Sequence, residues 1–396
     1  MPDRIVKLAE LVDANHLEIS AGRPRSVDLA RYPIPILRVA DVLDGKIESS
    51  HQGSISEASA QELGPKVSRV GDVVLTTKGT VGRVAIMPSG GPLFAYSPQL
   101  CYFRAEPDGP LRARYLYYWF KSADFWNQAN VLKGQTDMAD FLSLGDIFSL
   151  KMRLPSLADQ AGIAAALGAL DDKIAVNERI AATADDLSRA LFGEALLKSV
   201  DGFSDQPLSA VSEFINGRAF TKGATGTGRM VVRIAEINSG PGGSTVYSEI
   251  DVPDRHLARP GDLLFAWSGS LTAARWFRSE AIINQHIFKC TPRDGYPIWL
   301  VSQLVHRKLD EFRSIAADKA TTMGHIQRRH LDEPVPVPVP KTLGALDRVI
   351  SPLWERALVA EQESLSLATL RDTLLPQLMS GRIRVKDAEK IVEDHV

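Results

Sequence analysis

The chain has 396 residues, 44% of them hydrophobic and 24% charged, which suits a folded protein long enough for two domains. Its net charge of −2 provides no strongly basic field that would by itself indicate nucleic acid, but it permits a local DNA-binding face. Two cysteines, Cys101 and Cys290, exclude a disulfide framework or a zinc site, and no apolar run is long enough for a membrane span. Because the first residues also lack an apolar signal core, we expect a cytoplasmic protein with no membrane contact.

Residues 1–153 predict a first domain of mixed type. The segments 34–39, 72–77 and 100–105 are rich in β-branched and aromatic residues and are bounded by Gly, Pro and Asp, which is typical of strands. The amphipathic segment 112–129 predicts a helix. Residues 154–200, which begin with LPS, have a long helical pattern. The proline in LPS supports a helix start here, because proline is common just before a helix.

Residues 201–340 repeat this order as a second domain. Strand patterns occur at 230–235, 262–267 and 286–290, and a helical pattern covers 298–312. The proline-rich sequence VPVPVPK then leads into residues 341–396, a second long helix and a C-terminal tail. Strands and helices in both halves indicate the α+β class.

Five pairs of segments indicate that the chain is an internal duplication. They keep their order, while the offset between partners falls slowly from 195 to 183 residues, as changes in loop length would produce. One of these pairs matches Gln99 with Gln285. The matched pairs are 36–45 with 231–240, 70–82 with 260–272, 97–103 with 283–289, 154–160 with 339–345, and 170–180 with 353–363.

Each long helix carries a narrow apolar seam in which residues recur at steps of four and three. A seam of this kind requires a partner, and the other long helix, packed antiparallel as a coiled coil, is the most economical one. An ordinary core contact or a dimer contact is the alternative, and a polar Asn in the seam then serves only to set the register. The seam residues are Leu167, Leu170, Ile174 and Asn177 in the first helix and Leu353 and Ala357 in the second.

Three motifs give the whole chain a resemblance to the specificity subunits of type I restriction–modification enzymes. They are L-P-x-L-x-x-Q at 154–160, L-D-x-K-I-x-x-N at 170–177 and L-L-P-x-L-x-S-G-x-I-x-V at 374–385. The chain departs from the family pattern at Gly168 and Gly193, inside the first long helix. The second long helix also begins without the glutamine of the first motif.

The resemblance implies a non-catalytic protein without a cofactor. Each globular domain would be a target-recognition domain that reads one half of a bipartite sequence in double-stranded DNA. The helices would set the spacer between the half-sites and dock two methyltransferase (modification) subunits, and restriction subunits would join through the complex.

The residues themselves show no catalytic constellation. Neither a GxxxxGK[ST] phosphate loop nor an Asn-Pro-Pro-aromatic tetrapeptide occurs. The sequence GATGTG at 223–228 follows no strong strand, so a flexible loop is the better interpretation. Asp171, Asp172 and Lys173 lie on a helix far from other carboxylates in sequence, which favours a solvated helix face. The histidines are too scattered to predict a metal site.

Repeat-matched loops supply the candidate DNA contacts. Lys and Arg can neutralise phosphates, whereas Arg, Lys, Gln, Ser and Thr can also read base edges. The alternative for each residue is an ordinary polar loop. The candidates are Arg23, Arg25, Lys78, Thr80, Arg83, Lys133 and Gln135 in the first repeat and Arg218, Lys222, Ser268, Ser270, Arg275 and Lys319 in the second.

Two other classes of function remain open from the residues. A coiled-coil scaffold with two protein-binding domains would suit the nearly neutral halves of the chain. A stand-alone DNA-binding regulator would also use two domains. The salt dependence of DNA binding separates the scaffold from the DNA-recognition subunit, because phosphate contacts release counterions.

Overall fold

The structure, a computed structural model, describes residues 4–22, 34–48, 54–55, 64–135, 140–198, 201–317 and 324–396. The chain divides into two compact units. Unit 1 contains residues 1–172 and 368–396, and unit 2 contains residues 173–367. Both divisions fall inside a long helix, so each unit contains part of both. No helix in the described ranges is long and apolar enough to cross a membrane.

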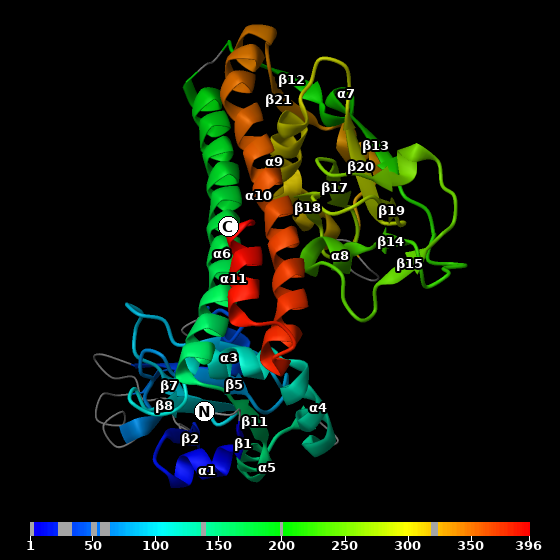
Figure 1. Cartoon of the computed structure of the whole chain (residues 1–396). Helices are drawn as coiled ribbons and strands as arrows, with labels where there is room; N and C mark the ends of the chain where they lie inside the picture. Colours follow the sequence, from blue (N-terminus) through cyan, green and yellow to red (C-terminus); the bar gives the residue numbers. More distant parts are fainter. Residues whose placement is uncertain are drawn as a thin grey trace. The chain divides into compact units, whose positions relative to one another are not determined.

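The two long helices are α6 (Leu157–Lys198) and α10 (Pro340–Ser380), drawn in green and orange in Figure 1. In unit 2, Asn177 of α6 bonds to Glu363 of α10, and further along α6 the alanines at 181 and 184 pack against those at 357 and 360. Residue numbers rise in one helix as they fall in the other. The predicted antiparallel pairing is confirmed.

The seam combines apolar packing with one polar contact. Leu167 and Leu170 are fully buried, as is Ala357, whereas Ile174 and Leu353 are half-buried. Asn177 is 1% exposed, and its Nδ2 donates to Glu363 Oε2 at 2.9 Å. A buried amide with one charged partner favours this register, because a shifted helix would leave the amide without a hydrogen bond.

Two motif residues close the ends of the helices in unit 1. The fully buried Gln160 accepts a hydrogen bond from Arg112 N at 2.9 Å and donates to Pro110 O and Pro155 O at 2.8 and 3.0 Å. Its amide therefore fixes the start of α6 to the loop before α3. Gly381 follows α10 with φ +71°, and a Cβ there would overlap the Arg153 guanidinium. Both reasons favour glycine at the end of α10.

Unit 1 is built on a four-stranded antiparallel sheet that we call its central sheet. A second sheet lies beside it, in which β3 pairs parallel with β7 and antiparallel with β4. The order of the central sheet is β2 (Leu17–Ala21), β8 (Leu100–Ala105), β5 (Val73–Thr76), β6 (Val84–Ile86). The second sheet contains β4 (Ser54–Ile55), β3 (Ile34–Leu37) and β7 (Ala95–Tyr96), and two further pairs are β1 (Arg4–Lys7) with β11 (Lys151–Leu154) and β9 (Gly134–Gln135) with β10 (Asp140–Phe141).

The central sheet of unit 1 is covered on both faces. Val74 packs with Leu37 and Tyr96 of the second sheet, whereas the ring of Phe103 packs at a tilt against that of Phe120 of α3. Every residue of β5 is therefore buried, and its first three residues are apolar without alternation. The helices of unit 1 besides the long pair are α1 (Leu8–Asp13), α3 (Ala113–Lys121), α4 (Ala123–Leu132), α5 (Leu144–Ser149) and α11 (Val385–Glu393), with 3₁₀ turns η1 (Val39–Asp41) and η2 (Gly64–Lys66).

Unit 2 repeats this plan. Its central sheet has the order β13 (Ser212–Asn216), β20 (Ile287–Pro292), β17 (Leu263–Ala266), β18 (Thr272–Arg275). Its second sheet has the order β15 (Val246–Ser248), β14 (Arg229–Val232), β19 (Ala281–Ile283), β16 (Leu257–Ala258), and β12 (Phe203–Pro207) pairs with β21 (Pro334–Pro338). Short helices are α7 (Leu208–Val211) and α8 (Ile234–Ser239), with η3 (Asp254–His256) and η4 (Arg328–Asp332).

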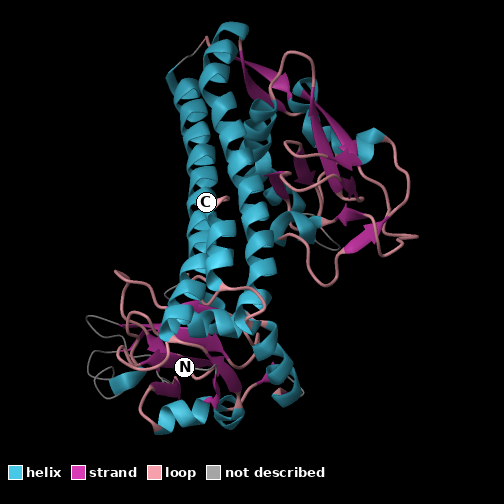
Figure 2. Ribbon diagram, viewed as in Figure 1, coloured by secondary structure: helices cyan, strands magenta, loops and turns pink. Residues whose placement is uncertain are grey.

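Helix α9 (Ile298–Ala317) covers the central sheet of unit 2, between its strands (magenta in Figure 2) and α10. Phe312 of α9 stacks on Phe265 of β17, and Trp299 packs in the same cluster as Ile350 of α10. The strand orders and directions of the two units match, including the parallel pairs β3–β7 and β14–β19. The chain is therefore an internal duplication of an α+β domain, as its sequence predicts.

The helix predicted at 112–129 is two helices in the structure. Ser122 is extended, donates to Trp119 O at 2.7 Å and accepts from Phe125 N at 3.4 Å. Its hydroxyl ends α3 and caps α4, so the apolar pattern continues while the backbone does not. The single helix predicted at 298–312 is present as α9.

Glycines in α6 supply a matched pair of stability tests. A Cβ on Gly162 would overlap Val385 Cγ1 of α11, whereas a Cβ on Gly193 would meet nothing within 4 Å. Alanine is favoured over glycine in a helix by about 1 kcal/mol. We expect Gly193→Ala to raise the thermal midpoint of unfolding, and Gly162→Ala to lower it because α11 must move.

Differential scanning calorimetry of both variants measures the difference. The intrinsic helix gain is common to the two substitutions, so their difference isolates the contact with α11. An equal rise in both would show that α11 does not pack on Gly162.

Candidate nucleic-acid interface

In unit 1, the loops at one edge of the central sheet are held together by main-chain hydrogen bonds. Gly22 N, at the end of β2, donates to Leu100 O at 3.0 Å, and Thr77 N, after β5, donates to Gln99 O at 2.9 Å. Gly79 N donates to Asp140 O at 3.2 Å, which adds the β9–β10 hairpin. We call the described segments at this edge (76–83, 97–100, 133–135 and 140–142) the first loop cluster.

Unit 2 has the same bonds at the same edge. Gly217 N donates to Ile287 O at 3.0 Å, Trp267 N to His286 O at 3.1 Å and Gly269 N to Gly324 O at 2.8 Å. The second loop cluster contains residues 216–222, 266–271, 284–287 and 324–326. Each of these three bonds of the first cluster therefore has a counterpart in the second.

Glycine is required at one position of each cluster. A Cβ on Gly22 would overlap the carbonyl oxygens of Tyr96 and Ser97, and a Cβ on Gly217 would overlap those of Ile283 and Asn284. These oxygens belong to the main chain and cannot turn away. The first residue after β2 and after β13 must therefore lack a side chain.

The equivalent bonds correct the sequence match at this edge. Thr77 bonds to Gln99 where Trp267 bonds to His286, so Gln99 corresponds to His286 and not to Gln285. The match of 154–160 with 339–345 is also wrong, by two residues. Leu8 N bonds to Leu150 O where Leu208 N bonds to Glu333 O, an offset of 183 that makes Gln160 equivalent to Leu343.

Several of the predicted contact residues are brought together. In the first cluster, Lys78 and Thr80 are exposed, Arg83 is half-buried, and Lys133 pairs with Asp140 at 2.8 Å. The main chain of Gln135 belongs to β9, but its side chain lies outside what the structure describes.

In the second cluster, Arg218, Lys222 and Ser270 are exposed and Ser268 is buried. Arg23 and Arg25, which follow Gly22, and Lys319 lie outside the described residues.

Arg275 does not face solvent with this group. Its side chain is 3% exposed and bonds to Glu361 of α10 at 2.8 Å and to Asp185 of α6 at 3.1 Å. The guanidinium also lies 4.4 Å from the centre of the Trp354 ring. Burial alone would lower the pKa of Arg275, but the hydrogen bonds that it donates to Glu361 and Asp185 outweigh burial, so the pKa is raised. Its assignment as a DNA contact is therefore corrected: Arg275 is a charged anchor between β18 and the helices.

Comparison with known proteins finds a similar domain family. Residues 25–184 match the family model described as the type I restriction modification DNA specificity domain. This part of the chain is therefore similar to that specificity domain. No curated protein sequence matches the chain.

A solved relative supports the fold of the whole chain. The S subunit of a type I restriction–modification system from M. genitalium covers 96% of both chains with a TM-score of 0.56 at 13% identity.

Two other solved structures cover as much of the chain with lower scores. The HsdS subunit from Thermoanaerobacter tengcongensis has a TM-score of 0.37 at 17% identity and covers 96% of this chain and 97% of its own. A chain from work on complex assembly and conformational transition of the type I R-M system has a TM-score of 0.38 at 18% identity. It covers 96% of this chain and 98% of its own.

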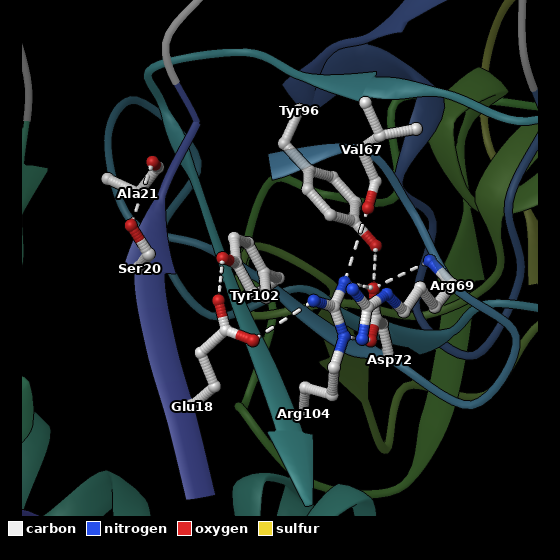
Figure 3. Close-up of polar contacts among 9 residues, drawn as sticks. All are labelled: Glu18, Ser20, Ala21, Val67, Arg69, Asp72, Tyr96, Tyr102 and Arg104. Carbon is white, nitrogen blue, oxygen red and sulfur yellow. Dashed lines mark hydrogen bonds and ion pairs between the residues drawn. The ribbon is translucent and has the colours of Figure 1, made fainter. Parts of the chain in front are cut away.

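A second polar group of this chain was not predicted from the sequence (Figure 3). Arg104 bonds to Asp72 through Nε and Nη2 at 2.8 Å each and to Glu18 at 3.0 Å, and Tyr96 of β7 donates to Asp72 Oδ2 at 2.7 Å. Burial, and then the charge of Asp72, raise the pKa of Tyr96. Glu18, Asp72 and Arg104 lie near the start of β2, just before β5 and near the end of β8, at the edge of the central sheet opposite the first loop cluster.

The equivalent residues of unit 2 indicate that the polar group around Asp72 is structural. In unit 2, Asp262 occupies the place of Asp72 and pairs with Lys289 at 2.7 Å. Lys289 stands opposite Leu264 in the register, where Tyr102 stands opposite Val74 in unit 1, so the cation enters from a different position. The shared Gly-Asp in VGDVVL and PGDLLF was the available sequence signal. Asp72 is buried and Asp262 is half-buried, and a cation pairs with the aspartate in both units, so the ion pair is structural.

The other candidate chemistries resolve into ordinary contacts. Strand β14, and not a helix, follows the glycine-rich segment 223–228, so no helix N-terminus could hold a phosphate there. Asp171 bonds to Arg371 at 2.8 Å, and Asp172 to Arg114 at 3.3 Å. In the described part of the chain, no three His, Cys, Asp or Glu residues are placed to hold a metal ion.

We expect Arg275→Met to lower the free energy of unfolding by about 3 kcal/mol, because it leaves Glu361 and Asp185 without their cation. This value is the lower end of the usual loss of stability when one partner of a buried ion pair is removed, because Asp185 is 43% exposed. Arg278→Met is the matched control, since Arg278 has no ion pair with any described residue. Urea denaturation of both variants measures the effect, and equal losses would contradict the anchor.

Proposed function

We propose that this chain is the non-catalytic DNA-recognition subunit of a type I restriction–modification complex, acting in the cytoplasm. In this proposal the first loop cluster reads one half of a bipartite duplex sequence and the second reads the other half. One observation carries it: two main-chain frames with equivalent hydrogen bonds carry different side chains. Lys78 and Gln99 of the first cluster stand where Ser268 and His286 stand in the second. Two related frames with different polar groups suit two different half-sites.

Exposed cations beside these frames supply the phosphate contacts of the proposal. Lys78 lies in the first cluster, and Arg218 and Lys222 lie in the second. Charged residues that contact phosphates position a protein on the duplex, and they do not select its sequence. The polar side chains of the frames would then select the bases.

The long helices complete the proposal. They set the spacer between the half-sites and dock two modification subunits, through which restriction subunits join. Large apolar residues remain exposed on both helices of unit 2, which favours contact with another protein. They are Val176 (39%) and Leu187 (46%) on α6 and Val349 (48%) and Val359 (53%) on α10.

Lys78→Ala should weaken DNA binding by the complex of this chain with its modification subunits and leave the preferred sequence unchanged. If Lys78 contacts one phosphate, the slope of log affinity against log salt should fall by about 0.9. Fluorescence anisotropy across a salt series measures both quantities.

Lys7→Ala is the control for this variant, because Lys7 is an exposed lysine on β1, outside the central sheet and its loop cluster. An unchanged slope for Lys78→Ala would remove Lys78 from the interface. A chain whose complexes bind DNA with no salt dependence in the wild type would instead be a protein-binding scaffold.

Lengthening both helices at facing positions should lengthen the spacer. We would insert four helix-forming residues after Arg179 and four after Glu361, which face each other given the Asn177–Glu363 bond. Four residues add about 6 Å and a rotation of roughly 40°. One base pair adds about 3.4 Å and 34–36°. The added rotation matches that of one base pair. We therefore expect a spacer longer by one base pair with both half-sites unchanged. Sequencing of the methylated sites measures the spacer.

Insertion into α6 alone is the control, and it should destabilise the chain because the seam loses its register. Both insertion sites leave Arg275, Asp185 and Glu361 on the same side of the added residues. Full activity with an unchanged spacer would show that the helices do not measure DNA.

A further inference from the structure

A three-residue connection joins the second sheet to the central sheet in each unit. In unit 1, Ser97–Pro98–Gln99 links β7 to β8, and in unit 2, Asn284–Gln285–His286 links β19 to β20. Both connections lie inside the loop clusters, which also contain the exposed cations Lys78 in the first and Arg218 and Lys222 in the second. Neither connection was predicted from the sequence to contact DNA.

Main-chain bonds hold both connections at each end. Ser97 N donates to Leu37 O at 3.0 Å, and Gln99 O accepts from Thr77 N at 2.9 Å. Asn284 N donates to Val232 O at 3.2 Å, and His286 O accepts from Trp267 N at 3.1 Å. A side chain on such a fixed segment loses little conformational entropy when it binds, which suits recognition.

One glutamine is exposed on each connection, at adjacent positions of the shared frame. Gln99 is the third residue in unit 1, and Gln285 is the second residue in unit 2. Neither side chain has a hydrogen bond to a described residue. The main chains of the two connections also differ. Gln285 N donates to Arg218 O at 2.9 Å, whereas Pro98, at the equivalent position of unit 1, has no N–H to donate.

The residues around the glutamines have two features that are typical of binding sites: buried polar atoms without partners and a strained backbone. The first residue of each connection is buried and has a polar atom with no partner in the described ranges, Ser97 Oγ and Asn284 Oδ1. Buried polar atoms without partners are uncommon in folded proteins. His286 has φ +73°, a left-handed conformation that is rare for residues other than glycine, and its ring centre lies 5.2 Å from that of Trp267. Such strain is concentrated at functional sites.

We propose that Gln99 and Gln285 are specificity-determining residues that each read one base pair through the major groove, in the first and second half-site respectively. A glutamine amide offers one donor and one acceptor, which match N7 and the N6 amino group of adenine. The base read by each glutamine is therefore adenine. This inference rests on the proposed function, since it names the groups that read each half-site.

The test compares two single substitutions that control for each other. Complexes of the modification subunits with wild-type chain, Gln99→Ala or Gln285→Ala select from a library of duplexes with randomised segments, and the selected duplexes are sequenced. We expect each variant to lose about ten- to a hundredfold discrimination for adenine at one base pair of its own half-site. The other half-site and the salt dependence should be unchanged, because no charge is altered.

Gln285→Glu gives a change of preference in place of a loss. Glutamate only accepts hydrogen bonds and matches the amino group of cytosine. We expect cytosine to replace adenine at the position that Gln285→Ala relaxes. Thermal unfolding of all variants should match the wild type, because both side chains are exposed.

The outcomes separate this inference from the function on which it rests. If the wild type selects a bipartite sequence and both alanine variants select the same sequence with the same discrimination, the glutamines do not read bases and the inference is overturned. A change in both half-sites from a single substitution would overturn it too. If the wild-type complex selects no sequence, the proposed function itself fails.

Discussion

The close antiparallel contact between α6 and α10 fixes the position of the central sheet in unit 2. Alanines at 181, 184, 357 and 360 allow the two helices to approach closely, and this approach brings Asp185 and Glu361 to the same cation. Two partly buried carboxylates facing one another would repel without a counter-charge. Arg275 supplies that charge from β18, so the packing of small side chains in the seam determines where the sheet is held.

The duplicated frame carries two different sets of side chains on one fold. Main-chain bonds, a glycine with no space for a side chain and an aspartate paired with a cation recur in both units. Backbone bonds do not depend on side-chain identity, so matched positions such as the exposed Lys78 and the buried Ser268 are free to differ. The aspartate keeps its role while its cation changes from Arg104 to Lys289.

Repeated segments and helical periodicity were predictable from the sequence, and side-chain contacts between distant segments were not. The duplication, both long helices and most of the seam follow from repeats and heptad spacing. Arg275 was misassigned because its carboxylates lie 90 and 86 residues away in the sequence. The Gln99–Gln285 match was wrong by one residue because sequence similarity rewards identical letters, whereas the hydrogen bonds align Gln99 with His286. The break at Ser122 was missed because a capping hydroxyl leaves the apolar pattern intact.

The composition of unit 1 from two separated stretches has a consequence for its biosynthesis. Residues 368–396 are made after the whole of unit 2, yet they supply part of the interior of unit 1. Leu374 and Leu378, for example, are only 2% and 1% exposed in the finished chain. During translation, the first stretch of unit 1 therefore leaves the ribosome before the residues that complete its interior. Its unpaired apolar surface stays exposed during that interval, which favours aggregation.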